Sequence, residues 1–173
     1  EYMETVTGFS ASLIQSLGGD TEKAAKYADM TITDMSDNAN KMGTDMSSIQ
    51  NAYQGFAKQN YTMLDNLKLG YGGTKQEMER LLADAEKIAG VKYDISSYAD
   101  VVEAIHVMQV SMDIAGTTAK EADATISGSV NALKSAVSNL IVGFGDADAD
   151  MELLCSNMAD AFKTVIANVA PVI

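Results

Sequence analysis

The sequence predicts an all-α protein, built as a multi-helix bundle or as helical hairpins without significant sheet. Pro171 is the only proline among 173 residues, so almost nothing in the chain forbids helix. Apolar residues recur at helical spacing, whereas no alternating run rich in β-branched residues indicates a strand. Glycines divide the chain into helical lengths, as expected of residues that end helices.

Capping residues indicate where the helices begin. Thr74 with Glu77, and Thr118 with Glu121, match the capping box, in which the two side chains satisfy exposed backbone amides. Further N-caps are expected at Asp20, at Thr44 and Asp45, and at Ser96 and Ser97. The sequence therefore predicts helices over 3–17, 21–42, 46–60, 62–69, 75–89, 98–115, 119–143 and 149–169.

The C-terminal third is expected to form an antiparallel helical hairpin. One apolar series advances by alternating steps of four and three, the spacing of a helix–helix seam: Ile126, Val130, Leu133, Val137, Leu140 and Phe144. A second series continues the rhythm, with Met151, Leu154, Met158, Ala161, Val165 and Asn168, widened by Phe162, Ile166 and Val169. Between them Gly143, Gly145 and the acidic run 146–150 predict a turn.

The segment before the hairpin is predicted to contribute a further apolar helix face. Its members are Tyr98, Val101, Val102, Ile105, Met108 and Met112. The preceding stretch, 92–97, is expected to be a short extended connection in which Tyr93 and Ile95 are anchored, without forming a sheet.

Composition restricts the classes of function. Twelve basic and twenty-four acidic residues give a formal charge of −12 and a pI of about 4.3, which disfavours stable binding of nucleic acid because phosphates are repelled. The length suits one domain, 1–173, with 1–90 and 98–173 as an alternative division into sub-units. The chain begins at Glu1 without a signal-like segment, and no apolar run is long enough to span a bilayer. We therefore expect a soluble helical piece of a longer protein, with no membrane contact.

Two strings superficially suggest a bound ion. The run Gly70-Tyr71-Gly72-Gly73-Thr74-Lys75 is rich in glycine, but a phosphate loop requires Lys before the hydroxyl and a preceding strand. The run 146–150 begins like a calcium loop, but Met151 stands where the loop requires glycine and Asn157 where it requires glutamate. We expect a helix–helix turn at the first string and acidic residues favouring a helix N-terminus at the second.

No catalytic constellation is expected, and neither cofactor nor metal is predicted. His106 is the only histidine and Cys155 the only cysteine, so one histidine would have to serve every role. We therefore expect neither a Cys–His–Asn nor a Ser–His–Asp constellation. His106 is expected to be a satisfied or surface histidine, and Cys155 a small core residue. The eleven methionines indicate adaptable helix packing, with a Met-rich groove for a partner helix as the alternative function, a non-enzymatic binding module.

One stretch resembles a known family. Residues 51–75, continuing into 77–82, closely resemble the core region of tail tape measure proteins of phages and prophages of Gram-positive bacteria, and 28–43 and 117–131 resemble the flanking segments. The most specific part is the string Leu69, Gly70, Tyr71, Gly72, Gly73, Thr74 and Lys75, which we interpret as a structural turn.

The resemblance implies a structural protein without enzymatic activity. Tape measure proteins are long and mostly helical, fill the lumen of the tail tube, set tail length during assembly in the host cytoplasm, and are ejected at DNA injection. The implied partners are the tail tube protein, tail assembly chaperones and other copies of the chain, and the implied location is the virion tail. Because glycines and caps interrupt the helices, we expect the isolated piece to be compact.

Overall fold

The fold is all-α, as predicted. The computed structural model describes residues 2–117 and 124–168, and no strand occurs in these ranges. Seven α-helices and one 3₁₀ helix are packed together: α1 Tyr2–Ser16, α2 Thr21–Met42, α3 Met46–Ala57, η1 Leu64–Leu67, α4 Lys75–Ala89, α5 Tyr98–Ser111, α7 Ala124–Gly143 and α8 Met151–Asn168.

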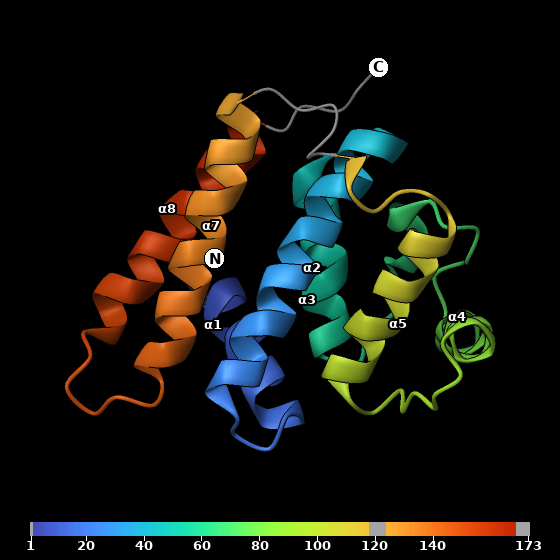
Figure 1. Cartoon of the computed structure of the whole chain (residues 1–173), viewed down its shortest axis with the longest axis horizontal. Coiled ribbons are helices and arrows are strands. Elements are labelled where there is room, and N and C mark those ends of the chain that lie inside the picture. Colours follow the sequence, from blue (N-terminus) through green and yellow to red (C-terminus); the bar gives the residue numbers. More distant parts are fainter. Residues whose placement is uncertain (1, 118–123, 169–173) are drawn as a thin grey trace.

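Helix α2 is the centre of the bundle. Figure 1 shows the α7–α8 pair on one side of it and the α5–α4 pair on the other, with α4 seen end-on. Helix α2 packs against α1, α3, α5 and α7. Its residues from Asp34 to Ala39 are all buried, a full turn and a half with no exposed side, so this part of the helix meets protein all round.

Four of the predicted N-caps are present. The side chains of Asp20, Asp45, Thr74 and Ser97 each accept a hydrogen bond from the backbone amide three residues later, at the starts of α2, α3, α4 and α5. Gly43 and Gly90 end α2 and α4 with φ of 69° and 73°, the left-handed conformation that favours glycine. The second predicted capping box, at Thr118 and Glu121, lies outside the described residues.

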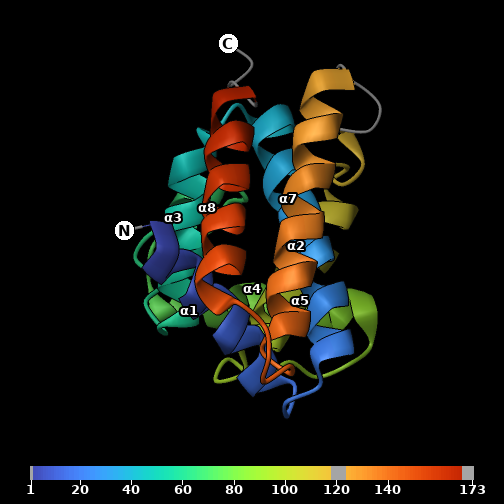
Figure 2. The ribbon, with the colours of Figure 1, turned by 90° about the vertical axis from the view of Figure 1, so that its left-hand side faces the viewer.

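The antiparallel hairpin is confirmed. Figure 2 shows α7 and α8 side by side, joined at one end by the turn that the sequence predicts. Val130, Leu133, Val137 and Leu140 are buried on α7, facing a core that includes Met158, Phe162 and Val165 of α8. A Cβ on Gly143 would lie 2.4 Å from Cδ1 of Leu154, so the two helices approach closely where they meet the turn.

Two helices end earlier than predicted, for the same reason. Helix α3 ends at Ala57 rather than 60, and α5 ends at Ser111 rather than 115. Gln59 and Asp113 adopt φ of 58° and 63°, and the amides of Asn60 and Ile114 bond back to carbonyls five residues earlier. These are helix-ending motifs built without glycine, which the glycine rule cannot find.

Three further expectations are wrong. Segment 62–69 is not an α-helix but the single 3₁₀ turn η1, ended by Lys68 at φ 54°. Phe144 is 39% exposed rather than seam-forming, because α7 has already ended at Gly143. Met112 is 42% exposed because it follows the end of α5. The side chains of Ile126 and Val169 lie outside the described part of the chain.

Residues 92–97 connect α4 to α5 without forming a strand, as predicted. Tyr93 is buried, and the Tyr61 hydroxyl donates to the carbonyl of Ile95 at 3.2 Å. None of the helices in the described residues combines the length and apolar character needed to cross a bilayer. The division into 1–90 and 98–173 stays a prediction, although α4 and α5 pack on each other across that boundary.

We predict that Leu140→Ala lowers the free energy of unfolding by about 2–5 kcal/mol, because Leu140 is fully buried in the hairpin seam. Val142→Ala, two residues along the same helix but 59% exposed, should change it by less than about 0.5 kcal/mol. Urea unfolding followed by circular dichroism measures both. Equal effects would show that the hairpin does not pack on this seam.

Candidate functional site

The string that carries the family resemblance lies between η1 and α4. Leu69 and Tyr71 are buried, whereas the glycines at 70, 72 and 73 form the turn that reverses the chain. Thr74 caps α4 through its hydroxyl, which accepts from the Glu77 amide at 3.1 Å, and Lys75 is the first helical residue. These residues thus form the connection between η1 and α4.

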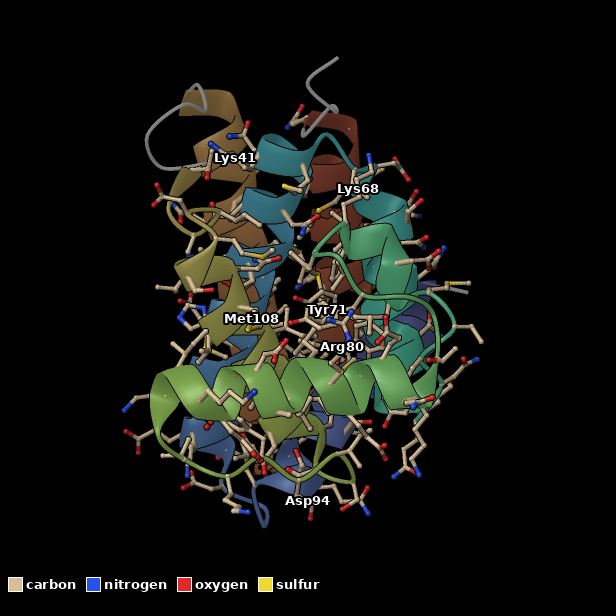
Figure 3. The ribbon with its side chains drawn as sticks, turned by 90° about the vertical axis from the view of Figure 1, so that its right-hand side faces the viewer. Lys41, Lys68, Tyr71, Arg80, Asp94 and Met108 are labelled. Carbon is tan, nitrogen blue, oxygen red and sulfur yellow. The ribbon has the colours of Figure 1, made fainter. Side chains whose placement is uncertain are left out.

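Arg80 joins this turn to α4. Its guanidinium lies 4.3 Å from the centroid of the Tyr71 ring, and Nη2 donates to the carbonyl of Gly70 at 3.0 Å. Nε and Nη2 also donate to the two carboxylate oxygens of Glu77, at 2.6 and 2.9 Å. Figure 3 shows Tyr71 and Arg80 next to each other beside α4. We call Tyr71, Glu77, Arg80 and Asp84 the Tyr71 clamp.

Hydrogen bonds within the Tyr71 clamp shift the pKa values of Glu77 and Tyr71. The Arg80 side chain, helped by the amide of Gly72, lowers the pKa of Glu77 to about 2. Burial, followed by the hydrogen bond that the Tyr71 hydroxyl donates to Asp84, raises the pKa of Tyr71 to about 12. Glu77 therefore stays ionised and Tyr71 stays protonated throughout the physiological range.

The capping box at α4 is only half formed. Glu77 does not reach back to the amide of Thr74 but accepts from the amide of Gly72 at 3.1 Å. The Glu77 carboxylate thus accepts a hydrogen bond from a loop amide that a bound phosphate would require. The anion beside this turn is therefore a side chain of the protein. At the second ion-like string, Asp150 accepts from the amide of Leu153 and so caps α8, as expected of acidic residues before a helix.

Gly73 is required by a close approach of two backbone segments. A Cβ placed on Gly73 would lie 2.2 Å from the carbonyl oxygen of Thr62, far inside contact distance. The backbone at Thr62 cannot yield as the end of a flexible side chain would. The turn after η1 is therefore packed directly on the turn before it.

A second arrangement, which sequence reasoning missed, joins α2 to α5. Nδ1 of His106 lies 2.9 and 3.0 Å from the two oxygens of Asp34, a carboxylate whose side chain is only 2% exposed. The side chain of His106 itself is 35% exposed. The only histidine of the chain is thus satisfied, as predicted, and it connects a buried carboxylate with the surface.

Two buried amides continue this connection. Nδ2 of Asn38 donates to the carbonyl of Leu67 and to Oε1 of Gln109, both at 2.9 Å, and Nε2 of Gln109 donates to the backbone carbonyl of Asp34 at 3.0 Å. The chain of amides runs between two backbone carbonyl oxygens, those of Leu67 and Asp34. Exchanging the oxygen and nitrogen of either side-chain amide would therefore place two acceptors against each other. The chain of amides fixes α2, α5 and η1 relative to one another.

Asp37 anchors the segment that follows α5. Its Oδ2 accepts a hydrogen bond of 2.7 Å from the amide of Gly116, which has φ of 84°. We call Asp34, Asp37, Asn38, His106 and Gln109 the polar seam. Four of these side chains are almost completely buried, which is costly for a polar group without a partner; among the described residues Oδ1 of Asn38 has none.

The pKa values of His106 and Asp34 in the seam both lie above the ordinary values of these groups. The hydrogen bond to Asp34 is the main cause that raises the pKa of His106. Burial raises the pKa of Asp34, although His106 opposes this effect. The chemistry that this arrangement offers is an oriented imidazole and an ion pair, because Asp34 fixes Nδ1 and leaves Nε2 as the other ring nitrogen.

Tyr53 and Tyr98 stand beside the seam with contrasting hydroxyl groups. The Tyr98 hydroxyl donates to the carbonyl of Tyr53 at 3.1 Å, whereas the Tyr53 hydroxyl, also fully buried, has no hydrogen-bond partner among the described residues. Burial and the nearby charge of Asp34 raise the pKa of Tyr53, so its hydroxyl stays protonated.

Sequence reasoning missed the polar seam because its residues look like an exposed helix face. Asp34, Asp37 and Asn38 lie in a polar run of α2, and Gln109 lies between apolar residues of α5. The available signal was their helical spacing, because Asp34 and Asn38 lie about one turn apart on one helix, and His106 and Gln109 lie about one turn apart on another. Spacing alone does not tell which polar face is buried.

The methionines are mainly core residues. Met35, Met46, Met78, Met108 and Met158 are buried, and Cys155 is buried as expected. A surface groove of about 470 Å³ lies between α2 and α7, and its lining residues include Ala25, Lys26, Asp29, Ser138 and Val142 but no methionine. In the ranges 2–117 and 124–168, no group of three or more His, Cys, Asp or Glu residues is placed to hold a metal ion.

We predict opposite effects for two glycine-to-alanine substitutions. Gly73→Ala should destabilise the protein by at least about 1–3 kcal/mol, since the new methyl would overlap the carbonyl of Thr62. Gly128→Ala, in the second turn of α7 with nothing within 4 Å of its Cβ position, should stabilise it by about 0.5–1 kcal/mol. Thermal unfolding of both variants gives the sign, and a neutral Gly73→Ala would contradict the close approach.

We also predict that two tyrosine-to-phenylalanine substitutions differ in sign. Tyr98→Phe should cost about 0.5–1.5 kcal/mol, because it removes a buried hydrogen bond. Tyr53→Phe removes a hydroxyl without a partner among the described residues and should be neutral or stabilising. Chemical denaturation compares them. A clear loss of stability in Tyr53→Phe would show that this hydroxyl is hydrogen-bonded after all.

The chain was compared with protein-family models, with curated proteins and with solved structures, and none of the three comparisons found a match. Any assignment of function therefore depends on the residues and geometry of the chain itself.

Proposed function

We propose that the chain is a structural segment of a phage tail tape measure protein, which sets tail length during assembly and leaves the tube at DNA injection. The observation that carries the proposal is the resemblance of residues 51–82 to the core region of that family. The proposal includes the tail tube protein, tail assembly chaperones and further copies of the chain as partners. It assigns no catalytic role.

The residues that carry the resemblance form one connected unit in the fold. They run from α3 through η1 and the glycine turn into α4, and the Tyr71 clamp closes this unit on itself. Leu67 connects it to Asn38 of the central helix. The polar and glycine residues of the string thus act in folding, which agrees with a structural rather than a chemical role for the segment.

A ruler function requires the bundle to unpack. At 1.5 Å per residue, 173 residues in one continuous helix would reach about 260 Å, whereas α2, the longest described helix at 22 residues, is only about 33 Å long. The folded form is therefore a storage or assembly form in this proposal. Extension in the tube would exchange contacts between helices for contacts with the tube wall or with other copies.

The charge of the chain suits a protein that shares a channel with DNA. A net charge of −12 repels phosphate, so a segment that fills the tube would not retain the DNA that later passes through it.

The test is the length of the tail. An in-frame deletion of all 173 residues from the parent gene should shorten the tails by up to about 260 Å, measured by electron microscopy of virions. An in-frame duplication should lengthen them by a similar amount, and it answers the question even if the deletion prevents assembly.

The matched control keeps the number of residues constant. Arg80→Ala disrupts the Tyr71 clamp without changing chain length, so tails that form should have the normal length. Tails of unchanged length with the duplication present in the virion would overturn the proposal.

A further inference from the structure

Helix α2 is held by different forces on its two sides. Helix α7 buries mainly apolar residues, among them Val130, Leu133 and Val137, and a 3.7 Å ion pair joins its Lys134 to the exposed Asp29 of α2. Toward α5 the contacts are the hydrogen bonds of the polar seam. Among the described residues, the second side contains a buried carboxylate, Asp34, whose partner His106 can titrate.

Among the described residues, His106 is the one group that can place a positive charge beside the buried carboxylate of Asp34. Asp34 faces His106 from α5 and lies near the Tyr53 hydroxyl from α3. His106 is also influenced by Asp37 of α2 and by Glu103 of its own helix, and Glu103 accepts from the hydroxyl of Tyr27 at 3.4 Å. Apart from the imidazole, the titratable groups facing this site in the described residues are acids or tyrosines.

We propose that the polar seam is a pH-sensitive latch, in which loss of the His106 proton loosens α5 from α2 while the α7–α8 hairpin remains attached. Asp34 then keeps its charge in a buried position beside further acids, with only a neutral imidazole as donor. Helix α4 packs on α5 and follows it. The α4–α5 pair is therefore the part of the bundle that opens first as the pH rises.

The sign follows from the direction of the two pKa shifts. Both His106 and Asp34 have folded-state pKa values above their ordinary values of 6.5 and 3.8, so the closed seam binds protons more firmly than the open one. The stabilisation by His106 is complete below its ordinary pKa and is lost as the pH rises through the raised value. Stability of the seam therefore falls with increasing pH, and Asp34 contributes with the same sign.

Native-state hydrogen exchange of the intact chain between pH 6 and 9 tests the latch. After correction for intrinsic exchange, protection of α5 amides should fall by up to tenfold per pH unit above about 6.5, the limit for release of one proton. Protection of α7 amides in the same molecules should stay nearly constant. Equal loss in both helices would mean global unfolding and would overturn the proposal.

Substitutions assign the effect to individual groups. His106→Gln keeps an amide donor for Asp34 but cannot titrate, and Asp34→Asn removes the buried charge, so either should abolish the pH dependence of α5 protection. Asp29→Asn is the matched control, since it removes an exposed carboxylate from the same helix and should leave the dependence intact. A slope that persists in His106→Gln would overturn the proposal, because the chain has no other histidine.

A direct titration keeps the test decisive if a variant folds poorly. The imidazole signals of the native chain, followed by nuclear magnetic resonance, should give a pKa above 6.5 for His106, and an ordinary or lowered value would overturn the proposal. The outcome depends only on the contact between α2 and α5. It can therefore fail while the tail assignment stands, and the reverse also holds.

Discussion

A carboxylate buried on the central helix constrains the whole of the bundle. Asp34 is 1% exposed and lies on a part of α2 that is enclosed by other helices. A buried charge is costly without a partner, so α5 must place His106 beside it. Rotating α5 by one residue would turn His106 away by about 100°, and the same rotation would break the bonds of Gln109. The polar seam therefore fixes the register of α5 on α2.

The seam also reaches the glycine turn between η1 and α4. Asn38 donates to the carbonyl of Leu67 in η1, two residues before Leu69 begins the string. The Tyr71 clamp then holds the rest of the string against α4, which packs on α5. Four elements, α2, η1, α4 and α5, are thus connected in a closed circuit. We therefore expect a substitution in the Tyr71 clamp to alter the packing of the polar seam as well.

The two sides of α2 divide stability from specificity. The α7–α8 hairpin contributes buried apolar surface, which stabilises without depending on pH. The α5 side also buries apolar residues, among them Val101, Val102 and Ile105, and adds directional hydrogen bonds, which select one arrangement. Buried ion pairs often add little net stability, and a role in fixing register agrees with the position of this one. The proposed latch would make the two sides separable, a property that the extension proposed for a tail segment would need.

The sequence by itself determined the helices that begin with a capping residue and end with glycine, together with the apolar seam of the hairpin. These features are local: Asp20, Thr74, Gly43 and Gly90 act on amides and carbonyls within one turn. The ends of α3 and α5 escaped prediction because Gln59 and Asp113 adopt a glycine-like conformation that local preference does not favour. Only the tertiary structure decided that Asp34, Asp37 and Asn38 are buried and paired with α5. Their spacing is equally suited to an exposed helix face, and the energy that resolves the choice comes from partners some seventy residues away, such as His106 and Gln109.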